Sequence, residues 1–160
     1  MEPRQYGEVV MRIAIGTDEE DSLVPVITEE LVRQGHDVVV LARGEEWPEV
    51  GSAVGRAVAE GVVDAGVVCC WTGTGVAIAA NKVRGVRAAL CADAEIARGA
   101  RLWNDANVLA LGVRLTSPTV AKEILVQFFA TQPDPDEAAR IARVSEIESA
   151  DGEHVDRALG

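Results

Sequence analysis

Short apolar runs rich in β-branched residues alternate with longer amphipathic stretches along most of this chain, and this alternation restricts the fold more than any other feature. Five such runs are separated by stretches long enough to form helices. Because a helical crossover between successive strands makes them parallel, the pattern predicts a parallel sheet with helices on both faces. The expected fold class is α/β, a three-layer α/β/α Rossmann-like five-stranded parallel sheet with an extra C-terminal helix.

The periodicity also sets expected boundaries. The expected strands span 12–16, 37–41, 65–70, 86–91 and 107–112, and the expected helices span 22–34, 48–61, 74–82, 93–103, 117–131 and 137–149. We expect residues 1–10 to form a mobile lead-in, 11–131 the α/β domain and 150–160 a flexible tail. Residues 132–149 are expected to form a hinge and a helix that packs on a partner subunit, with a solvated terminal helix as the alternative.

The segment CCWTGTGVAIAANK at 69–82 carries the strongest functional indication. The third expected strand ends at Cys70, glycines follow at 73 and 75, and a helix-forming stretch comes next. Such a turn leaves backbone N–H groups unpaired at the helix start, where the helix dipole also favours an anion or a developing oxyanion. The same field can hold a cysteine as a thiolate. A base beside an oxyanion hole is what proton abstraction next to a carbonyl requires.

The alternative is that this cysteine and these glycines are purely structural. Glycines often occupy such turns for steric reasons, and a cysteine at a strand end is often a small core residue. Cys69, one residue back along the strand, should point to the opposite face and join the core. Cys91, which closes the fourth expected strand, is also expected to pack rather than react.

Ligands of parallel α/β sheets bind outside the carboxyl ends of the strands. This rule places Thr17, Asp18, the 70–75 turn, Asp93 and Gly112 along one edge of the sheet. Several polar and glycine residues are therefore expected to converge on a single crevice.

Composition excludes several classes of function. The formal net charge of −11 over 160 residues argues against binding to nucleic acid or to an anionic membrane, since both need basic patches. No stretch is apolar for long enough to span a bilayer, and the first residues lack a secretory pattern, so a cytoplasmic protein is expected. The odd cysteine count suits a reducing compartment, and no clustered His/Cys pattern indicates a metal site. The isolated His36 and His154 are expected to be solvated.

Further motifs occur in a fixed order along the chain. They are G-T-D at 16–18, W-P-E at 47–49, C-x-T-G-x-G-x-x-I-A-A-N-K at 70–82, G-V-R-A-A-L-C at 85–91 and N-D-A-N-V-L-A-L-G at 104–112. Together they resemble the ribose-5-phosphate isomerase type B family, which also contains the galactose-6-phosphate isomerase subunits. The match runs from about Arg12 to Ile147, so the chain is identified as a divergent member of this family.

The resemblance implies aldose–ketose isomerisation or epimerisation of a sugar or sugar phosphate through a cis-enediolate. It implies no metal and no cofactor, and a homodimer or tetramer whose active sites lie between subunits. It assigns proton abstraction to Cys70, proton movement at the neighbouring oxygen to Thr72, and contact with a substrate hydroxyl to Asp18. It also implies that backbone N–H groups of Gly73, Thr74, Gly75, Val76 and Ala77 hold the enediolate oxygen, with Asn104 nearby.

Three positions depart from the family pattern. Glu19, in the acidic run 18–21, replaces a phosphate-binding histidine, and like charges near a dianion are unfavourable. Trp103 stands where the family has the histidine that opens the sugar ring. Because tryptophan has one donor and no acceptor, it cannot shuttle that proton. Trp71 stands beside the base, where relatives have a small residue. These two indoles indicate a smaller, more apolar or differently shaped substrate pocket, and tryptophan also stacks well on sugar faces.

The phosphate-binding arginines of the family's C-terminal helix are partly kept. Arg143 aligns with one of them, and Arg140 lies about one residue away from another. Arg114, after the fifth expected strand, and Arg87, in the fourth, are further basic candidates. Arg87 could equally form a structural ion pair.

Two hypotheses follow from the kept and the changed residues. The first is an isomerase or epimerase with Cys70 as base, acting on a non-standard sugar or on a short sugar phosphate that cannot close a stable ring. The second is a non-catalytic sugar-binding paralogue, or a structural subunit of a hetero-oligomeric isomerase. An ordinary ribose-5-phosphate isomerase is a third and weaker interpretation, because two of its substrate-handling residues are absent.

Overall fold

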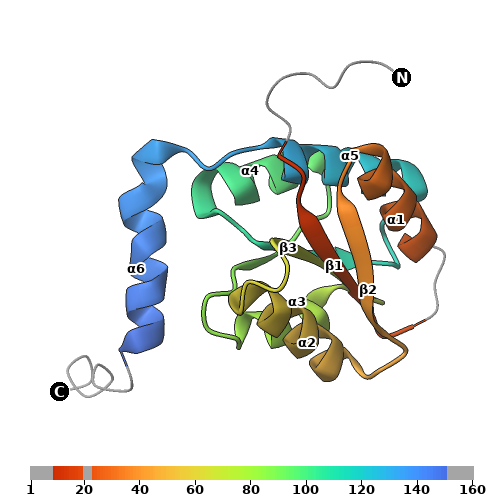
Figure 1. Cartoon of the computed structure of the whole chain (residues 1–160), viewed down its shortest axis with the longest axis horizontal. Helices are drawn as coiled ribbons and strands as arrows, with labels where there is room; N and C mark the ends of the chain where they lie inside the picture. The colour runs from red at the N-terminus through yellow and green to blue at the C-terminus, as the bar shows by residue number, and fades with distance from the viewer. Residues whose placement is uncertain (1–8, 20–22, 151–160) are drawn as a thin grey trace.

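The computed structural model of the chain describes residues 9–19 and 23–150, in which strands and helices alternate as predicted (Figure 1). The elements are β1 (Arg12–Thr17), α1 (Leu23–Arg33), β2 (Asp37–Arg43), α2 (Trp47–Ala59), β3 (Ala65–Cys70), α3 (Thr74–Asn81), β4 (Ala88–Leu90), α4 (Ala94–Asn104), β5 (Val108–Gly112), α5 (Pro118–Ala130), the 3-10 turn η1 (Pro135–Glu137) and α6 (Ala138–Ser149). The expected lead-in over 1–10 and tail over 150–160 lie almost entirely outside the described residues.

The five strands form one parallel sheet in the order β2-β1-β3-β5-β4. One apolar core joins the sheet to α1, α4 and α5, and a second joins its other face to α2 and α3. Figure 1 shows these two groups of helices on opposite sides of the strands. The predicted three-layer α/β/α architecture is confirmed.

The central strand β3 is buried along its whole length. Because successive side chains of a strand point to opposite faces, Cys69 packs in the core with α1, α4 and α5, and Cys70 packs in the core with α2 and α3. The predicted separation of the two cysteines across the sheet is confirmed.

Two strands differ in length from the prediction. β2 continues to Arg43 because its pairing with β1 resumes after a register shift between Ile15 and Gly16. β4 covers only three residues. The N–H of Arg87, just before β4, donates to the Asn107 side chain over 2.7 Å. An asparagine side chain 20 residues away therefore takes the place of a strand partner.

The expected terminal helix is divided by the turn η1, and α6 stands beside α4 at one side of the molecule (Figure 1). No residue of α6 is buried. Near its end, the Glu148 carboxylate accepts the N–H of Gly85 at 3.1 Å. Helix α6 is therefore attached to the rest of the domain without contributing to its core.

The expectation that His36 is solvated is wrong. Its Nδ1 accepts the N–H of Met11 over 3.2 Å, and its ring centroid lies 5.6 Å from that of Phe129. His36 is half-buried between the first described residues and α5. His154 lies outside the described residues.

Candidate active site

The carboxyl ends of three adjacent strands bring several predicted site residues to one edge of the sheet. Thr17 pairs with Cys69, so Asp18 leaves β1 next to the end of β3. Cys70 pairs with Gly112, so β5 ends beside them. The ends of these strands thus bring Asp18, Cys70 and the start of the glycine turn side by side.

The turn between β3 and α3 is packed closely against the end of β5. Gly73 has φ +77°, and a Cβ on it would lie 2.8 Å from the Gly112 nitrogen. A Cβ on Gly112 would lie 2.5 Å from the Thr72 carbonyl oxygen. The chain after β5 then extends the pairing, since Val113 N–H donates to the Cys70 carbonyl at 3.0 Å. Both glycines are therefore required for this close backbone approach.

Cys70 is 6% exposed, and its Sγ accepts the backbone N–H of Gly73 over 3.2 Å. This hydrogen bond holds the sulfur at the start of the glycine turn. Beside it, the hydroxyls of Thr72 and Thr74 lie 2.7 Å apart. This geometry suits a sulfur base with a hydroxyl pair next to it.

Helix α3 supplies backbone donors at the same place. The N–H of Ala77 bonds to the Gly73 carbonyl at 3.3 Å and is the first of the intrahelical bonds. The preceding N–H groups of Thr74, Gly75 and Val76 have no carbonyl acceptor within the helix, and the helix dipole is positive at this end. Val76 and Ala77 have buried side chains, and the N–H of Ala77 is bonded to Gly73, so of these two residues only Val76 can offer a backbone donor to the site. The arrangement provides donors for an oxyanion next to the Cys70 sulfur.

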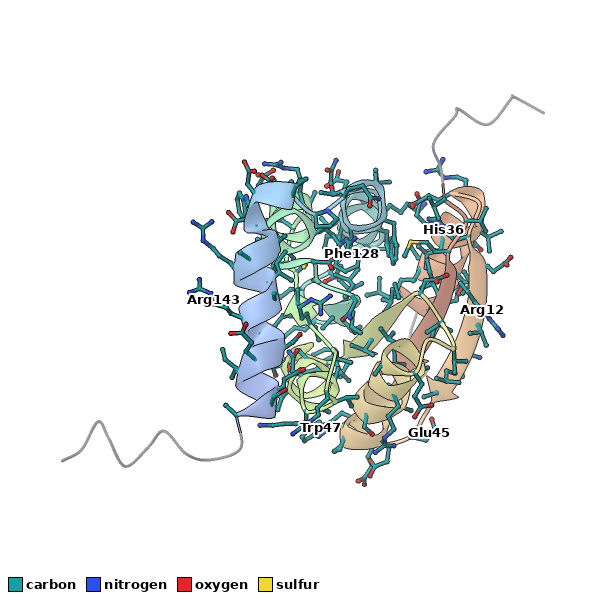
Figure 2. All side chains as sticks on the ribbon, turned by 60° about the vertical axis from the view of Figure 1, so that its left-hand side comes forward. Arg12, His36, Glu45, Trp47, Phe128 and Arg143 are labelled. Atoms are coloured by element: carbon teal, nitrogen blue, oxygen red, sulfur yellow. The ribbon has the colours of Figure 1, made fainter. Side chains whose placement is uncertain are left out.

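Two of the chain's three tryptophans border this edge. A Cβ on Gly75 would lie 2.9 Å from the Trp47 ring, so the indole rests directly on the first turn of α3 while 43% exposed. Figure 2 shows Trp47 at the start of α2. Sequence reasoning used Trp47 only as part of a motif and missed it as a site residue. The available signal was a large aromatic residue placed just before a helix-starting proline.

Trp71 is 54% exposed, and the Arg114 guanidinium carbon lies 6.0 Å from its ring centroid. The N–H of Arg114 also donates to the Trp71 carbonyl over 2.9 Å. These contacts hold a cation and an aromatic face together at the rim of the Cys70 edge.

The acidic segment after β1 begins at the same rim. The Thr17 hydroxyl donates to the Glu19 carbonyl over 2.8 Å where the chain bends, and the Glu19 side chain is exposed. Asp18 is half-buried. Glu20 and Asp21 lie outside the described residues. Carboxylates therefore stand at this rim, as the sequence predicts.

The remaining predicted residues lie at the opposite edge of the sheet. Trp103, Asn104 and Arg140 line one groove of about 440 Å³ between α6 and the amino end of β4. Five paired residues of β3 and β5 separate the two edges, which corresponds to about 16 Å. Within one chain these residues therefore do not lie next to Cys70.

The two arginines of α6 differ in their surroundings. Arg140 pairs with Glu137 at 2.5 Å, and this hydrogen bond raises the pKa of its guanidinium. Arg143 projects from the outer side of α6, away from the body (Figure 2). Only Arg140 borders the groove.

The other candidate residues have structural roles. The Arg87 guanidinium pairs with the Asp105 carboxylate at 3.1 Å and is therefore a structural ion pair. Burial, with a smaller contribution from Asp93, raises the pKa of the Cys91 thiol to about 12, so it stays protonated. Among the described residues no cluster of His, Cys, Asp and Glu could hold a metal, and no helix there could cross a membrane.

The model of the Ribose/Galactose Isomerase family matches residues 13–147. This chain belongs to that family. Within the Ribose/Galactose Isomerase family it is 39% identical over 122 residues to a D-erythrulose-4-phosphate isomerase of Pectobacterium atrosepticum, covering 72% of this chain and 80% of the relative. It is 37% identical over 133 residues to the galactose-6-phosphate isomerase subunit LacB of Clostridium acetobutylicum, covering 78% and 75%.

Solved structures of the Ribose/Galactose Isomerase family share the fold. Ribose-5-phosphate isomerase B of Clostridium thermocellum superposes with a TM-score of 0.80 at 36% identity, covering 87% of this chain and 98% of that one. The relatives are sugar-phosphate isomerases with different sugars in their names. Membership therefore establishes the type of enzyme and leaves the sugar to be inferred from the site.

Proposed function

We propose that this protein interconverts the aldose and ketose forms of a short, open-chain sugar phosphate, with Cys70 as the base. The observation that carries the proposal is the Gly73 N–H at 3.2 Å from the Cys70 sulfur, at the start of a helix whose first N–H groups are free to hold an oxyanion. A four-carbon sugar 4-phosphate is the substrate that fits the altered residues best.

In the direction from ketose to aldose, the Cys70 thiolate removes a proton from C1 and becomes a thiol. The electrons of that C–H bond form the C1–C2 double bond, and the C2 carbonyl oxygen takes the negative charge. Backbone N–H groups of the first turn of α3 hold this enediolate, and the hydroxyl of Thr72 moves a proton between the two oxygens. The Cys70 thiol then returns a proton to C2, which gives the aldose and restores the thiolate.

The identity of residue 103 supports an open-chain substrate. A ring form must be opened by a group that gives and accepts protons at the ring oxygens, and an indole has only an N–H donor. In a four-carbon sugar 4-phosphate, O4 is esterified, so no furanose can form and no opening step is needed. Two relatives of this chain are named as D-erythrulose-4-phosphate isomerases, which is consistent with this substrate class.

A complete site on this proposal needs two subunits. Cys70 and the groove that contains Trp103 and Arg140 lie at opposite edges of one sheet, about 16 Å apart along the strands. We infer a homodimer in which the Cys70 edge of one subunit faces this groove of the other. Helix α6, which has no buried residue in one subunit, is the element available to pack on the partner.

The phosphate is then held between subunits. Arg114 stands at the Cys70 edge, and Arg140 borders the facing groove, so the two guanidinium groups approach from different chains. Bidentate contacts from arginine suit a phosphate dianion, and they would offset the carboxylates at the end of β1.

A non-catalytic subunit of a hetero-oligomer is the second candidate. It is favoured by the likeness to LacB, whose name describes a subunit. The hydrogen bond between Gly73 and Cys70 supports the enzyme instead, because a structural subunit gains nothing from a sulfur held at the start of α3 beside open N–H groups.

Turnover assays on a panel of four-, five- and six-carbon aldose and ketose phosphates test the proposal. We expect conversion of D-erythrulose 4-phosphate to be fastest, and Cys70→Ala to abolish it. Cys69→Ala is the matched control, since this adjacent cysteine faces the other core and should leave turnover intact. Preference for ribose 5-phosphate would overturn the substrate assignment. Inactivity of the pure protein on every sugar phosphate of the panel would favour the second candidate, a non-catalytic subunit of a hetero-oligomer.

A further inference from the structure

The last turn of α4 is held in one conformation by charged groups around Asp105. This residue has φ +46°, and it is the single non-glycine residue with positive φ among those described. Its carboxylate pairs with Arg101 at 2.8 Å and with Arg87 at 3.1 Å, and Arg87 Nε also donates to its carbonyl at 2.8 Å. Left-handed backbone at a non-glycine residue costs on the order of 1 kcal/mol, and it persists only where the surroundings fix it.

The side chain of Trp103, at the end of this helix, is also fixed in place. It folds back along α4 onto Gly99, where a Cβ would lie 2.7 Å from the indole ring. A glycine inside a helix destabilises it by about 1 kcal/mol relative to alanine. Gly99 therefore lowers the stability of α4 and leaves room for the indole. The remaining 51% of the Trp103 side chain is exposed.

The exposed part of the indole borders the groove that it shares with Asn104 and Arg140. A phosphate held by Arg140 would place the attached sugar in the same groove, beside an aromatic surface that cannot retreat. Gly99 lies behind the ring, and the Asp105 ion pairs fix the backbone after it.

We propose that Trp103, held by Gly99 and by the ion pairs of Asp105, is a specificity-determining wall that limits turnover to open-chain sugar phosphates. This inference rests on the proposed function. A cyclic sugar phosphate that enters the groove meets a rigid surface with one N–H donor and no proton acceptor, so it binds without being opened. Ribose 5-phosphate is therefore an inhibitor of this protein rather than a good substrate.

The test is the ratio of kcat/KM for ribose 5-phosphate to kcat/KM for D-erythrulose 4-phosphate, measured in full-length protein and two variants at residue 103. Trp103→His supplies a proton donor and acceptor of smaller size, and it should raise the ratio at least about tenfold, since positioned acid–base groups contribute about 10²–10⁴ in rate. Trp103→Phe keeps a flat apolar wall and should leave the ratio near that of the unaltered chain. A ratio unchanged by Trp103→His would overturn the inference.

A third variant tests the role of the indole without replacing Trp103, so that misfolding of a residue-103 variant cannot decide the result. Gly99→Ala favours the helix but places a methyl group within 2.7 Å of the indole, so it displaces the ring with Trp103 still present. We expect ribose 5-phosphate to inhibit this variant more weakly, and unchanged inhibition would contradict the wall. If the unaltered protein turns over no open-chain phosphate, the proposed function itself fails. If the unaltered protein does turn over an open-chain phosphate and the variants show the same ratio of kcat/KM values, only the role of Trp103 fails.

Discussion

The backbone N–H of Gly73 donates to the sulfur of Cys70 over 3.2 Å, and Gly73 itself has a left-handed conformation with φ +77° that turns the chain from β3 into α3. The same turn that forms this bond also begins α3 and exposes its first N–H groups. The candidate base and the oxyanion donors are therefore one structural unit, and a change in the turn should alter both.

Replacement of Gly73 should disturb both the position of the base and the oxyanion donors. Gly73→Ala combines left-handed strain with a Cβ placed 2.8 Å from the backbone of β5. We therefore expect the unfolding free energy to fall by about 1–3 kcal/mol and kcat to fall at least about tenfold. Gly44→Ala is the control, because Gly44 has φ +84° but no atom within 4 Å of a Cβ. Equal effects of the two changes on kcat would contradict the account. Urea unfolding and steady-state kinetics measure both.

The contact between Trp47 and Gly75 should appear as coupling in a double-mutant cycle. Gly75→Ala pushes a methyl into the indole, and Trp47→Ala removes the indole. Each single change should lower kcat/KM, whereas the double variant should lose less than the sum, with a coupling energy of about 0.5–3 kcal/mol. Additive effects would show that Trp47 does not act through the first turn of α3.

The ion pairs of α4 should differ in their contribution to stability. Arg101 is mostly buried, and it donates to the Asp105 carboxylate at 2.8 Å and to the Ala106 carbonyl at 2.6 Å. Arg101→Met should therefore lower the unfolding free energy by about 1–3 kcal/mol. Arg98→Met is matched on the same helix, where the pair with Glu95 is exposed, and it should cost less than about 0.5 kcal/mol. A larger loss of unfolding free energy for Arg98→Met than for Arg101→Met, measured by urea unfolding, would contradict a stabilising role of the Arg101–Asp105 pair.

The buried thiol of Cys91 should make the protein sensitive to alkali. Its pKa is about 12 in the folded state against 9.0 for an ordinary thiol, so its contribution is complete below pH 9 and is lost as the pH rises from 9 towards 12. Between pH 8 and 10.5, the unaltered chain should lose up to about 2 kcal/mol more stability than Cys91→Val. Equal losses in urea unfolding at the two pH values would refute this assignment.

Assembly through α6 can be tested at its exposed apolar surface. Ile147 on α6 is 73% exposed in one subunit. If α6 packs on a partner, Ile147→Asp should give folded monomers with little activity, as judged by light scattering and circular dichroism. Val126→Asp alters an exposed apolar residue on α5 and should leave a dimer intact. A monomeric and fully active unaltered protein would contradict the two-subunit site.

Local patterns in the sequence were sufficient for the fold and for half of the site. The period of two along 65–70 separates Cys69 from Cys70, and the glycines at 73 and 75 mark the turn into α3. These features depend on residues that are neighbours in the chain, so composition and spacing reveal them.

Long-range contacts account for what sequence reasoning missed. The indole of Trp47 on Gly75 and the Asn107 side chain on the N–H of Arg87 join segments 20 or more residues apart, and no local pattern encodes them. The division of the site could have been inferred from topology. A residue that ends the helix before β5 must lie at the amino edge, so Asn104 could not meet Cys70 in one subunit.

Solvent deuterium incorporation tests the central claim most directly, because it follows the proton that Cys70 is proposed to move. The protein is incubated with D-erythrulose 4-phosphate in D₂O, and NMR measures deuterium at C1 of the ketose and at C2 of the aldose. The account predicts stereospecific incorporation at both carbons with the unaltered protein and with Cys69→Ala, and none above background with Cys70→Ala. Incorporation that persists at full rate in Cys70→Ala would contradict it.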